Sequence, residues 1–267
     1  MIVAVAALAG AVLCYGVAGD RLSAGAATAL RSRTWWTGTA LQGGAFFLAL
    51  LARRELPLLV VQSAIVTALA VTAVLQGARG VRRWGSGEAL AIAGTVAGLA
   101  LLAAATVTGP AAVRGSAVLV WSAAGLLVAA VGVALPGASW RSGVLSGVAF
   151  SVGAVGARVL VSGLPERWWL FWQLPGGTWA AGLLTAGGLL LGQLHLTRGL
   201  AVAPAVPVLG LMYVTSTVLP AAVGHWLLDE RVRPGWTAAA LAGCALALLA
   251  AVQLLRSGRD GSTARTG

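Results

Sequence analysis

Long apolar runs separated by short polar turns constrain this chain more than any other feature of its sequence. Each run is about 20 residues long, the length that an α-helix needs to cross the roughly 30 Å hydrocarbon core of a bilayer. We therefore predict nine membrane-spanning helices, at residues 1–18, 34–52, 57–77, 88–107, 115–135, 142–162, 178–198, 203–227 and 235–255.

The overall composition leads to the same class of protein. Hydrophobic residues make up 59% of the chain and charged residues only 9%. A soluble domain carries about 25% charged residues, so this chain has too few to cover a surface that faces water. We expect an all-α integral membrane protein in the cytoplasmic membrane, with the lipid bilayer as its surroundings.

The positive charge of the chain is explained by membrane topology better than by nucleic-acid binding. The net charge is +11, and all 18 basic residues are Arg, placed mainly in the turns between apolar runs. Cytoplasmic loops of membrane proteins favour such residues. Eleven Arg fall on the side of the C-terminal tail and seven on the other side, which predicts a cytoplasmic C-terminus and an N-terminus outside.

The two halves of the chain carry an internal repeat. Residues 34–56 align with residues 178–200 at an offset of 144, with identity at eight of 23 positions. A weaker match relates the first run to the sixth: Gly10, Gly16, Gly19 and Arg21 correspond to Gly147, Gly153, Gly156 and Arg158. Duplicated helical units are the architecture of many secondary transporters.

The repeat predicts two four-helix units of opposite orientation. Runs one to four pair with runs six to nine, so partners lie five spans apart and must cross the membrane in opposite directions, as an inverted repeat. The expected divisions are a first repeat at residues 1–113, a connecting helix at 114–140, a second repeat at 141–256 and a disordered tail at 257–267.

The sequence carries no pattern of catalytic or metal-binding residues. There is no paired carboxylate within a run, no nucleophile with a base at helical spacing, and no cluster of His and Cys. All seven acidic residues fall at run ends or in loops, where we expect them to cap a helix, pair with a nearby Arg or stay solvated. His195 and His225 are interpreted as interfacial side chains, with a proton-carrying role left open. We expect no enzyme, no cofactor and no metal.

Polar residues near the predicted midplane are the candidates for a binding site. Hydroxyl groups and glycines can simply serve close helix packing, but the run at 203–227 also holds prolines, which we expect to interrupt its helix. Interrupted helices at membrane depth are tolerated where they line a cavity. The predicted cavity-lining residues are Gln42, Thr67, Gly187, Gly210, Tyr213, Ser216 and Thr217, with Gly43, Gly44 and Gly188 in the adjacent walls.

An aromatic cluster follows the sixth run. Trp168, Trp169, Phe171 and Trp172 lie within nine residues of Leu164. Aromatic side chains gather at the interfaces between membrane and water. We interpret the cluster as such a belt, with an aromatic substrate platform as the alternative.

Two turns resemble those of the drug/metabolite transporter superfamily. The segment from Gly192 to Pro207, with its His-Leu-Thr-Arg turn and the following prolines, is similar to the junction between two helices in that superfamily. The turn from Leu227 to Gly235 resembles its Glu-containing turn, and Leu56 to Ser63 resembles the first-half equivalent, especially in the nine-span NIPA-like branch. The resemblance implies a membrane transporter of the EamA type.

This chain also departs from those relatives. It lacks a tenth span and a carboxylate buried in the first helix, where Cys14 and Tyr15 stand instead. Hard metal ions need oxygen ligands that usually include a carboxylate. We therefore expect neither a metal substrate nor a proton cycle driven by a buried carboxylate.

The expected function is transport of small metabolites or amphipathic compounds across the cytoplasmic membrane by alternating access. The alternative is a non-transporting helper subunit of another membrane complex. The expected partners are a small-molecule substrate and the bilayer, with a homodimer left open, and nucleic acid is not expected.

Overall fold

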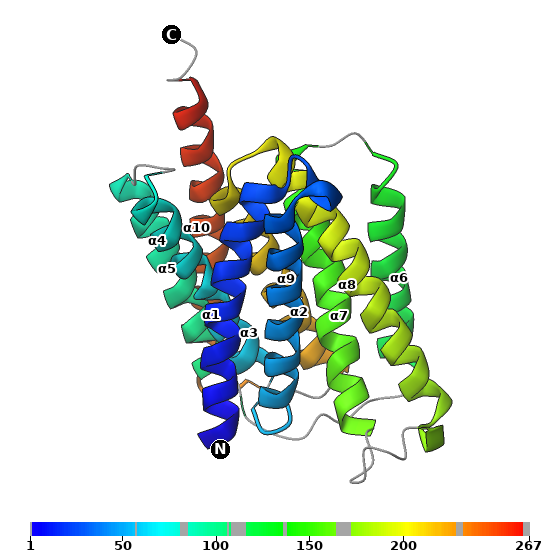
Figure 1. The fold of residues 1–267 in the computed structure, drawn as a ribbon. Coiled ribbons are helices and arrows are strands. Elements are labelled where there is room, and N and C mark those ends of the chain that lie inside the picture. Colours follow the sequence, from blue (N-terminus) through cyan, green and yellow to red (C-terminus); the bar gives the residue numbers. More distant parts are fainter. Residues whose placement is uncertain are drawn as a thin grey trace.

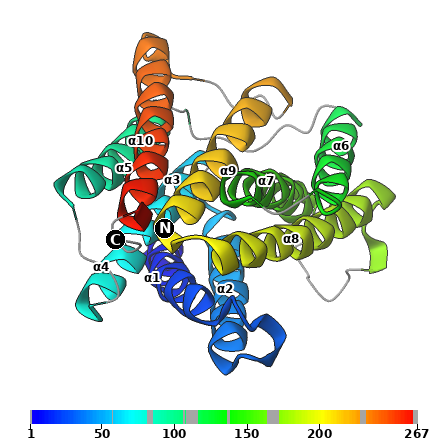
Figure 2. The same ribbon diagram turned by 90° about the horizontal axis from the view of Figure 1, so that it is seen from above.

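The chain forms an all-helical bundle in which apolar helices pack side by side (Figures 1 and 2). The computed structural model describes residues 2–56, 58–80, 85–105, 107, 116–135, 138–163, 172–227 and 232–263, and these residues contain no β-strand. The helices are α1 (Ile2–Gly25), α2 (Arg33–Ala52), α3 (Leu58–Val66), α4 (Ala68–Ala78), α5 (Ser86–Ala104), α6 (Ala117–Gly132), α7 (Ser139–Gly163), α8 (Gly176–Val202), α9 (Ala205–Leu227) and α10 (Thr237–Thr263), with a short 3₁₀ helix, η1 (Ala29–Arg31).

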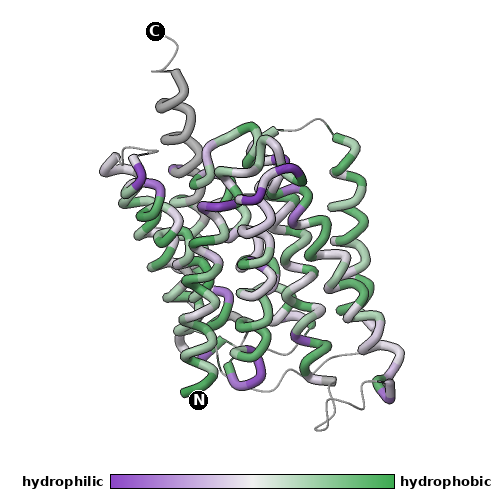
Figure 3. Tube along the Cα trace, viewed as in Figure 1, coloured by the Kyte–Doolittle hydropathy of each residue, from purple (hydrophilic) through white to green (hydrophobic). Residues whose placement is uncertain are grey.

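In the described part of the chain, five helical segments are long and apolar enough to cross a membrane. They cover Ile2–Gly25, Val60–Ala78, Ser139–Ser162, Gly176–Val202 and Ala205–Leu227. Figure 3 shows apolar residues along the middle of the bundle, with the most hydrophilic segments mainly toward its two ends. These features indicate a multi-pass membrane protein, as the composition predicts.

The helix directions alternate through the bundle. In Figure 1, α1 starts at the end where the N-terminus lies and α2 returns to it, whereas the C-terminus emerges at the opposite end after α10. Helices α7, α8, α9 and α10 run opposite to α1, α2, the α3–α4 pair and α5, respectively. Seen from above, α9 lies near the centre and α6 at the periphery (Figure 2).

Glycines set the closest helix crossings. A Cβ at Gly98 of α5 would lie 2.6 Å from the carbonyl oxygen of Gly243 in α10, and a Cβ at Gly243 would lie 2.5 Å from that of Gly98. At Gly188 of α8, a Cβ would lie 2.6 Å from the carbonyl oxygen of Ala149 in α7. Because a real side chain does not fit at these distances, the crossings require glycine.

Helix α4 is fastened to α1 by polar contacts. The Arg79 guanidinium pairs with the Asp20 carboxylate, whose side chain is only 3% exposed. The Thr72 hydroxyl donates to the carbonyl oxygen of Gly16 at 2.8 Å, and the Gln76 amide lies 3.0 Å from the Ser23 hydroxyl. Asp20 thus pairs with an Arg from another helix, one of the roles expected for the acidic residues at run ends.

Two side chains of α8 hold the C-terminal end of α6. Arg198 donates from Nη1 to the carbonyl oxygen of Val133 at 2.7 Å, and His195 Nε2 lies 2.8 Å from the carbonyl oxygen of Ala129. The last carbonyl groups of a helix have no hydrogen-bond partner within it. Each contact therefore supplies a partner to a carbonyl oxygen that would otherwise have none within the membrane. His195, which the sequence predicts near a membrane interface, is 1% exposed and packs within the protein.

The helix interruption lies in the first half of the chain, and the expectation that prolines interrupt the run at 203–227 is wrong. Helix α9 is continuous, with Pro220 inside it. Pro207 stands in its first turn, where an N–H would have no helical partner anyway. The break falls instead between α3 and α4 at Thr67, whose hydroxyl donates to the carbonyl oxygen of Ala64 at 2.6 Å. Such a bond competes with the regular helix ladder.

Two predicted features lie partly outside the described residues. Helix α10 continues past Arg256 to Thr263, where the sequence predicts a disordered tail, and residues 264–267 lie outside the description. Trp168, Trp169 and Phe171 of the aromatic cluster also lie outside it, whereas Trp172 is 60% exposed.

Candidate functional site

A cavity of about 300 Å³ lies in the middle of the bundle. Helices α1, α2 and α3 contribute one part of its wall, and α7, α8 and α9 contribute the other. Its described lining consists of Tyr15, Ala18, Gly19, Leu22, Thr39, Gln42, Gly43, Phe46, Phe47, Arg53, Gln62, Ile65, Phe150, Ala154, Leu189, Leu190, Gln193, Leu196, Leu209, Met212, Tyr213 and Ser216.

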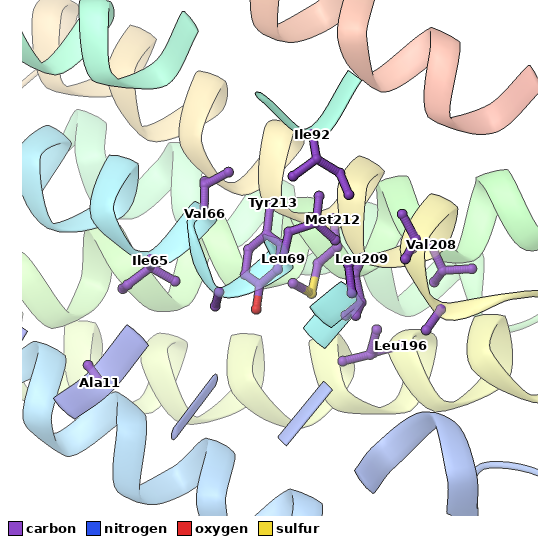
Figure 4. Close-up of a cluster of buried hydrophobic side chains, with 14 of the residues drawn as sticks. Ala11, Ile65, Val66, Leu69, Ile92, Leu196, Val208, Leu209, Met212 and Tyr213 are labelled. Atoms are coloured by element: carbon purple, nitrogen blue, oxygen red, sulfur yellow. The ribbon is translucent and has the colours of Figure 1, made fainter. Parts of the chain in front are cut away.

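The wall from α9 presents residues 209, 212, 213 and 216, which share one helical face. Tyr213 and Met212 belong to one cluster of buried side chains with Ile65, Leu69 and Leu196 (Figure 4). The hydroxyl groups of Ser216 and Thr217 both donate to the carbonyl oxygen of Tyr213, at 3.1 Å and 2.9 Å. The hydroxyls thus pair within their own helix, and α9 supplies a wall that is largely apolar.

Three of the seven predicted site residues line this cavity, namely Gln42, Tyr213 and Ser216. The other four are absent from its described lining. Thr67 forms the break between α3 and α4, and Gly187 faces α6, where a Cβ would lie 3.1 Å from the Leu126 side chain. Gly210 and Thr217 are buried in α9. Of the predicted adjacent glycines, Gly43 lines the cavity and Gly188 packs against α7.

The wall from α2 was mostly missed by the sequence reasoning. It consists of Thr39, Gln42, Gly43, Phe46 and Phe47. The spacing of these residues, i, i+3, i+4, i+7 and i+8, is that of one face of an α-helix. This wall could have been predicted from the sequence, because one face of the apolar run combines amide, hydroxyl, glycine and aromatic residues.

A buried cation lines the cavity at the C-terminal end of α2. It is Arg53, the C-cap residue of that helix. Its side chain is 2% exposed, and its Cζ lies 5.8 Å from the centre of the Phe46 ring. The carbonyl oxygen of Arg53 accepts a hydrogen bond of 2.9 Å from Arg158 Nη1 of α7. The sequence reasoning assigned Arg53 to a loop and used it only for the charge bias.

Helices α2 and α8 are joined by hydrogen bonds toward one end of the cavity. Trp35 Nε1 donates to the Thr197 hydroxyl at 3.0 Å, and Gln193 Nε2 donates to the Thr39 hydroxyl at 3.2 Å. Farther along α2, the lining residues Gly43 and Phe47 are exposed, as is Leu190 of α8, and a Cβ at Gly43 would meet no atom within 4 Å. The cavity wall between α2 and α8 is therefore closed by hydrogen bonds at one end, whereas at the other end its residues are exposed.

The polar groups of the described lining can form hydrogen bonds and an ion pair with a bound molecule. Besides Arg53, the described lining contains amides, hydroxyls and two phenols, and no Asp, Glu or His. Among the described residues, no three His, Cys, Asp or Glu gather as a metal site requires. This arrangement can hold a molecule and orient it.

The fold offers no established relative from which a function could be transferred. Comparisons with protein-family models, with curated proteins and with solved structures find no significant match to this chain. The resemblance to the drug/metabolite transporter superfamily therefore stays a prediction, and the function proposed below is based on the cavity.

Proposed function

We propose that this protein is a membrane transporter that moves small metabolites or amphipathic compounds by alternating access. The observation that carries the proposal is the cavity of about 300 Å³ enclosed by helices of both halves. Binding at the interface between repeats, near the bilayer midplane, is the usual arrangement in secondary transporters. A helper subunit, the alternative function, needs no such cavity.

The proposed architecture is an inverted repeat with nine spans. In this scheme α3 and α4 form one interrupted span, α1 pairs with α7, α2 with α8, the α3–α4 span with α9, and α5 with α10, while α6 is the connector. The opposite directions of the paired helices support it (Figure 1). The mutual contact of Gly98 and Gly243 supports it as well, because the two glycines stand in paired helices.

The hydrogen bonds between α2 and α8 act as a gate in this proposal. Trp35–Thr197 and Thr39–Gln193 hold one end closed. Transport requires that these bonds break while the opposite end closes. In the aligned repeats, Trp35 corresponds to Trp179 and Thr197 to Arg53. When the opposite end of the cavity closes, the end of α8 at Trp179 therefore moves toward the end of α2 at Arg53.

Cysteine labelling tests whether the cavity is accessible to water. Both native cysteines, Cys14 and Cys244, are free and are replaced by Ser, and single cysteines are then introduced at Gln42, Ser216 or Thr217. A water-soluble thiol reagent should label the first two variants, which line the cavity, and leave the variant at buried Thr217 unlabelled. Equal resistance of all three in folded protein would contradict an accessible cavity.

A cross-link across the gate tests transport itself. Metabolites inside and outside cells are compared between a deletion strain and strains complemented with wild type, T39C, Q193C or the double variant. The double variant should behave like the deletion when oxidised and recover with a membrane-permeable reductant, whereas each single variant stays active. Full activity of the cross-linked protein would exclude this gate, and identical metabolite profiles of deletion and wild type would count against a transporter.

A further inference from the structure

We propose that the cavity binds an amphipathic organic anion, whose acidic group is held by Arg53 and whose apolar part lies against the aromatic wall. This inference rests on the proposed function, because it names the chemical class of the transported molecule. It would apply equally to a free organic acid and to a lipid-derived acid such as a fatty acid.

The first argument is that Arg53 is a buried cation without a counter-ion. Its Nε and Nη1 atoms are buried and have no hydrogen-bond partner, and no salt bridge joins it to an acidic residue in the described part of the chain. An Arg side chain stays protonated in proteins, and burying an unpaired charge is costly. A charge kept at that cost within a membrane protein marks a functional site.

The second argument is that Arg53 faces the cavity and is held there. It belongs to the lining, and its guanidinium lies beside the ring of Phe46, another lining residue. The hydrogen bond from Arg158 fixes the backbone of Arg53 from the other half of the protein. Arg158 also places a second buried guanidinium near this end of the cavity. The guanidinium fork of Arg53 matches the geometry of a carboxylate or phosphate.

The third argument concerns the remaining lining. No described lining residue carries a negative charge, so no carboxylate there would repel an anion or pair with a cation. Phe46, Phe47 and Phe150 surround the cavity with apolar rings, and its size is at the lower end for small-molecule pockets. The buried Oε1 atom of Gln42 has no partner among the described residues and can accept a hydrogen bond from a ligand that carries an N–H or O–H donor besides its acidic group.

The exposed lining residues indicate how such a molecule could enter. Phe47 is 67% exposed and Leu190 is 73% exposed, and both border the cavity between α2 and α8. In a bilayer these two side chains face acyl chains. An amphipathic anion could therefore reach Arg53 with its apolar part still in contact with lipid, and the test must include a lipid-derived acid.

The test compares ligands that differ in charge alone. Thermal unfolding of the purified full chain in a neutral detergent is followed by circular dichroism with phenylacetate, its neutral amide phenylacetamide or the cation phenethylamine, and separately with oleate. A bound ligand stabilises the folded protein in proportion to its affinity and concentration. Phenylacetate or oleate should raise the midpoint, with the two other phenyl compounds at least about ten-fold weaker, as expected for the loss of a charge-assisted bond.

Variants at two neighbouring arginines separate binding from folding. R53Q should weaken anion binding by about ten-fold or more, and R53K should give an intermediate loss because it keeps the charge without the fork. R54Q is the matched control, since Arg54 is exposed and does not line the cavity. Without ligand, R53Q should also unfold at a higher temperature than wild type, because it removes an unpaired buried charge. A purely structural Arg53 would give the opposite shift.

Each outcome bears on the proposal. A response to oleate without one to phenylacetate supports the anion class with a lipid source, and a response to phenylacetate supports a free acid. Equal responses of the wild type to the anionic, neutral and cationic phenyl compounds would overturn the anion class, even if R53Q does not fold, while leaving a transporter of other compounds standing. The absence of any response to all four ligands would overturn the anion site, and only the gate experiment would then decide on transport.

Discussion

At the scale of single residues, two buried ionised side chains differ in whether they have a partner of opposite charge. Asp20 has its partner in Arg79, and both stand at helix ends where α1 meets α4. Arg53 has no counter-ion and faces the cavity. An unpaired buried charge opposes folding. The paired Asp20 therefore stabilises the bundle, whereas we propose that Arg53 is kept at the expense of stability for a ligand.

The Asp20–Arg79 pair yields a prediction about stability. R79A should lower the free energy of unfolding by about 1–3 kcal/mol, because it leaves the Asp20 carboxylate buried without its partner. D20N should cost less, because the Arg79 side chain is 41% exposed and can be hydrated. Thermal unfolding in detergent measures both. R21A, at the exposed neighbour of Asp20, should change little, and a loss as large as that of R79A would show that the pair is not the cause.

At the scale of helices, glycines decide how closely pairs of elements approach. The crossing of α5 and α10 brings Gly98 and Gly243 against each other's backbone, and Gly188 brings α8 against α7. Gly44 of α2 has the same residue type but an open environment, in which a Cβ would meet no atom within 4 Å. Sequence alone does not distinguish these glycines, because all lie within apolar runs.

This difference between glycines can be measured. G98A should destabilise the protein by about 1–3 kcal/mol, because the new methyl group must push α5 away from α10. G44A should be neutral or stabilising by up to about 1 kcal/mol, because Ala favours the helix more than Gly does. Unfolding midpoints of the two variants in the same detergent provide the comparison. If G98A is as stable as G44A, the α5–α10 crossing is not as close as described.

At the scale of the whole molecule, the two termini emerge at opposite ends of the bundle (Figure 1). Helix α9 ends and α10 begins at the end of the bundle where the N-terminus lies, and α10 ends at the other. The Arg bias predicts which end is cytoplasmic, since positive residues favour that side. The proposed gate between α2 and α8 lies toward the same end as the C-terminus, so the orientation also decides to which side this gate would close the cavity.

The orientation can be tested with fusions. A reporter that is active only in the cytoplasm should work when fused after Arg256 and fail when fused after Arg233. The reverse pattern would invert the topology, and equal activity at both positions would indicate insertion in two orientations. A second reporter that is active only outside the cytoplasm is the control for expression, and it should give the complementary result.

The sequence by itself determined the class of protein and the approximate position of its helices. Apolar run length and charge depletion are local properties, so they predict helices such as α1, α7 and α9 without knowledge of their neighbours. On the predicted face of α9, Tyr213 and Ser216 line the cavity, whereas Gly210 and Thr217 are buried and absent from its described lining. Polarity alone does not separate Ser216 from Thr217, because both hydroxyls pair with the same carbonyl group of their own helix.

Only the tertiary structure decided which residues share the cavity. The glycine pair of α5 and α10 and the closed end between α2 and α8 depend on contacts between segments distant in sequence. Arg53 is the clearest case. In the sequence it is one of two consecutive arginines in a turn, and nothing local separates it from the exposed Arg54. Its burial arises because α7 brings Arg158 to its carbonyl group while its side chain faces the cavity, and both are properties of the assembled bundle.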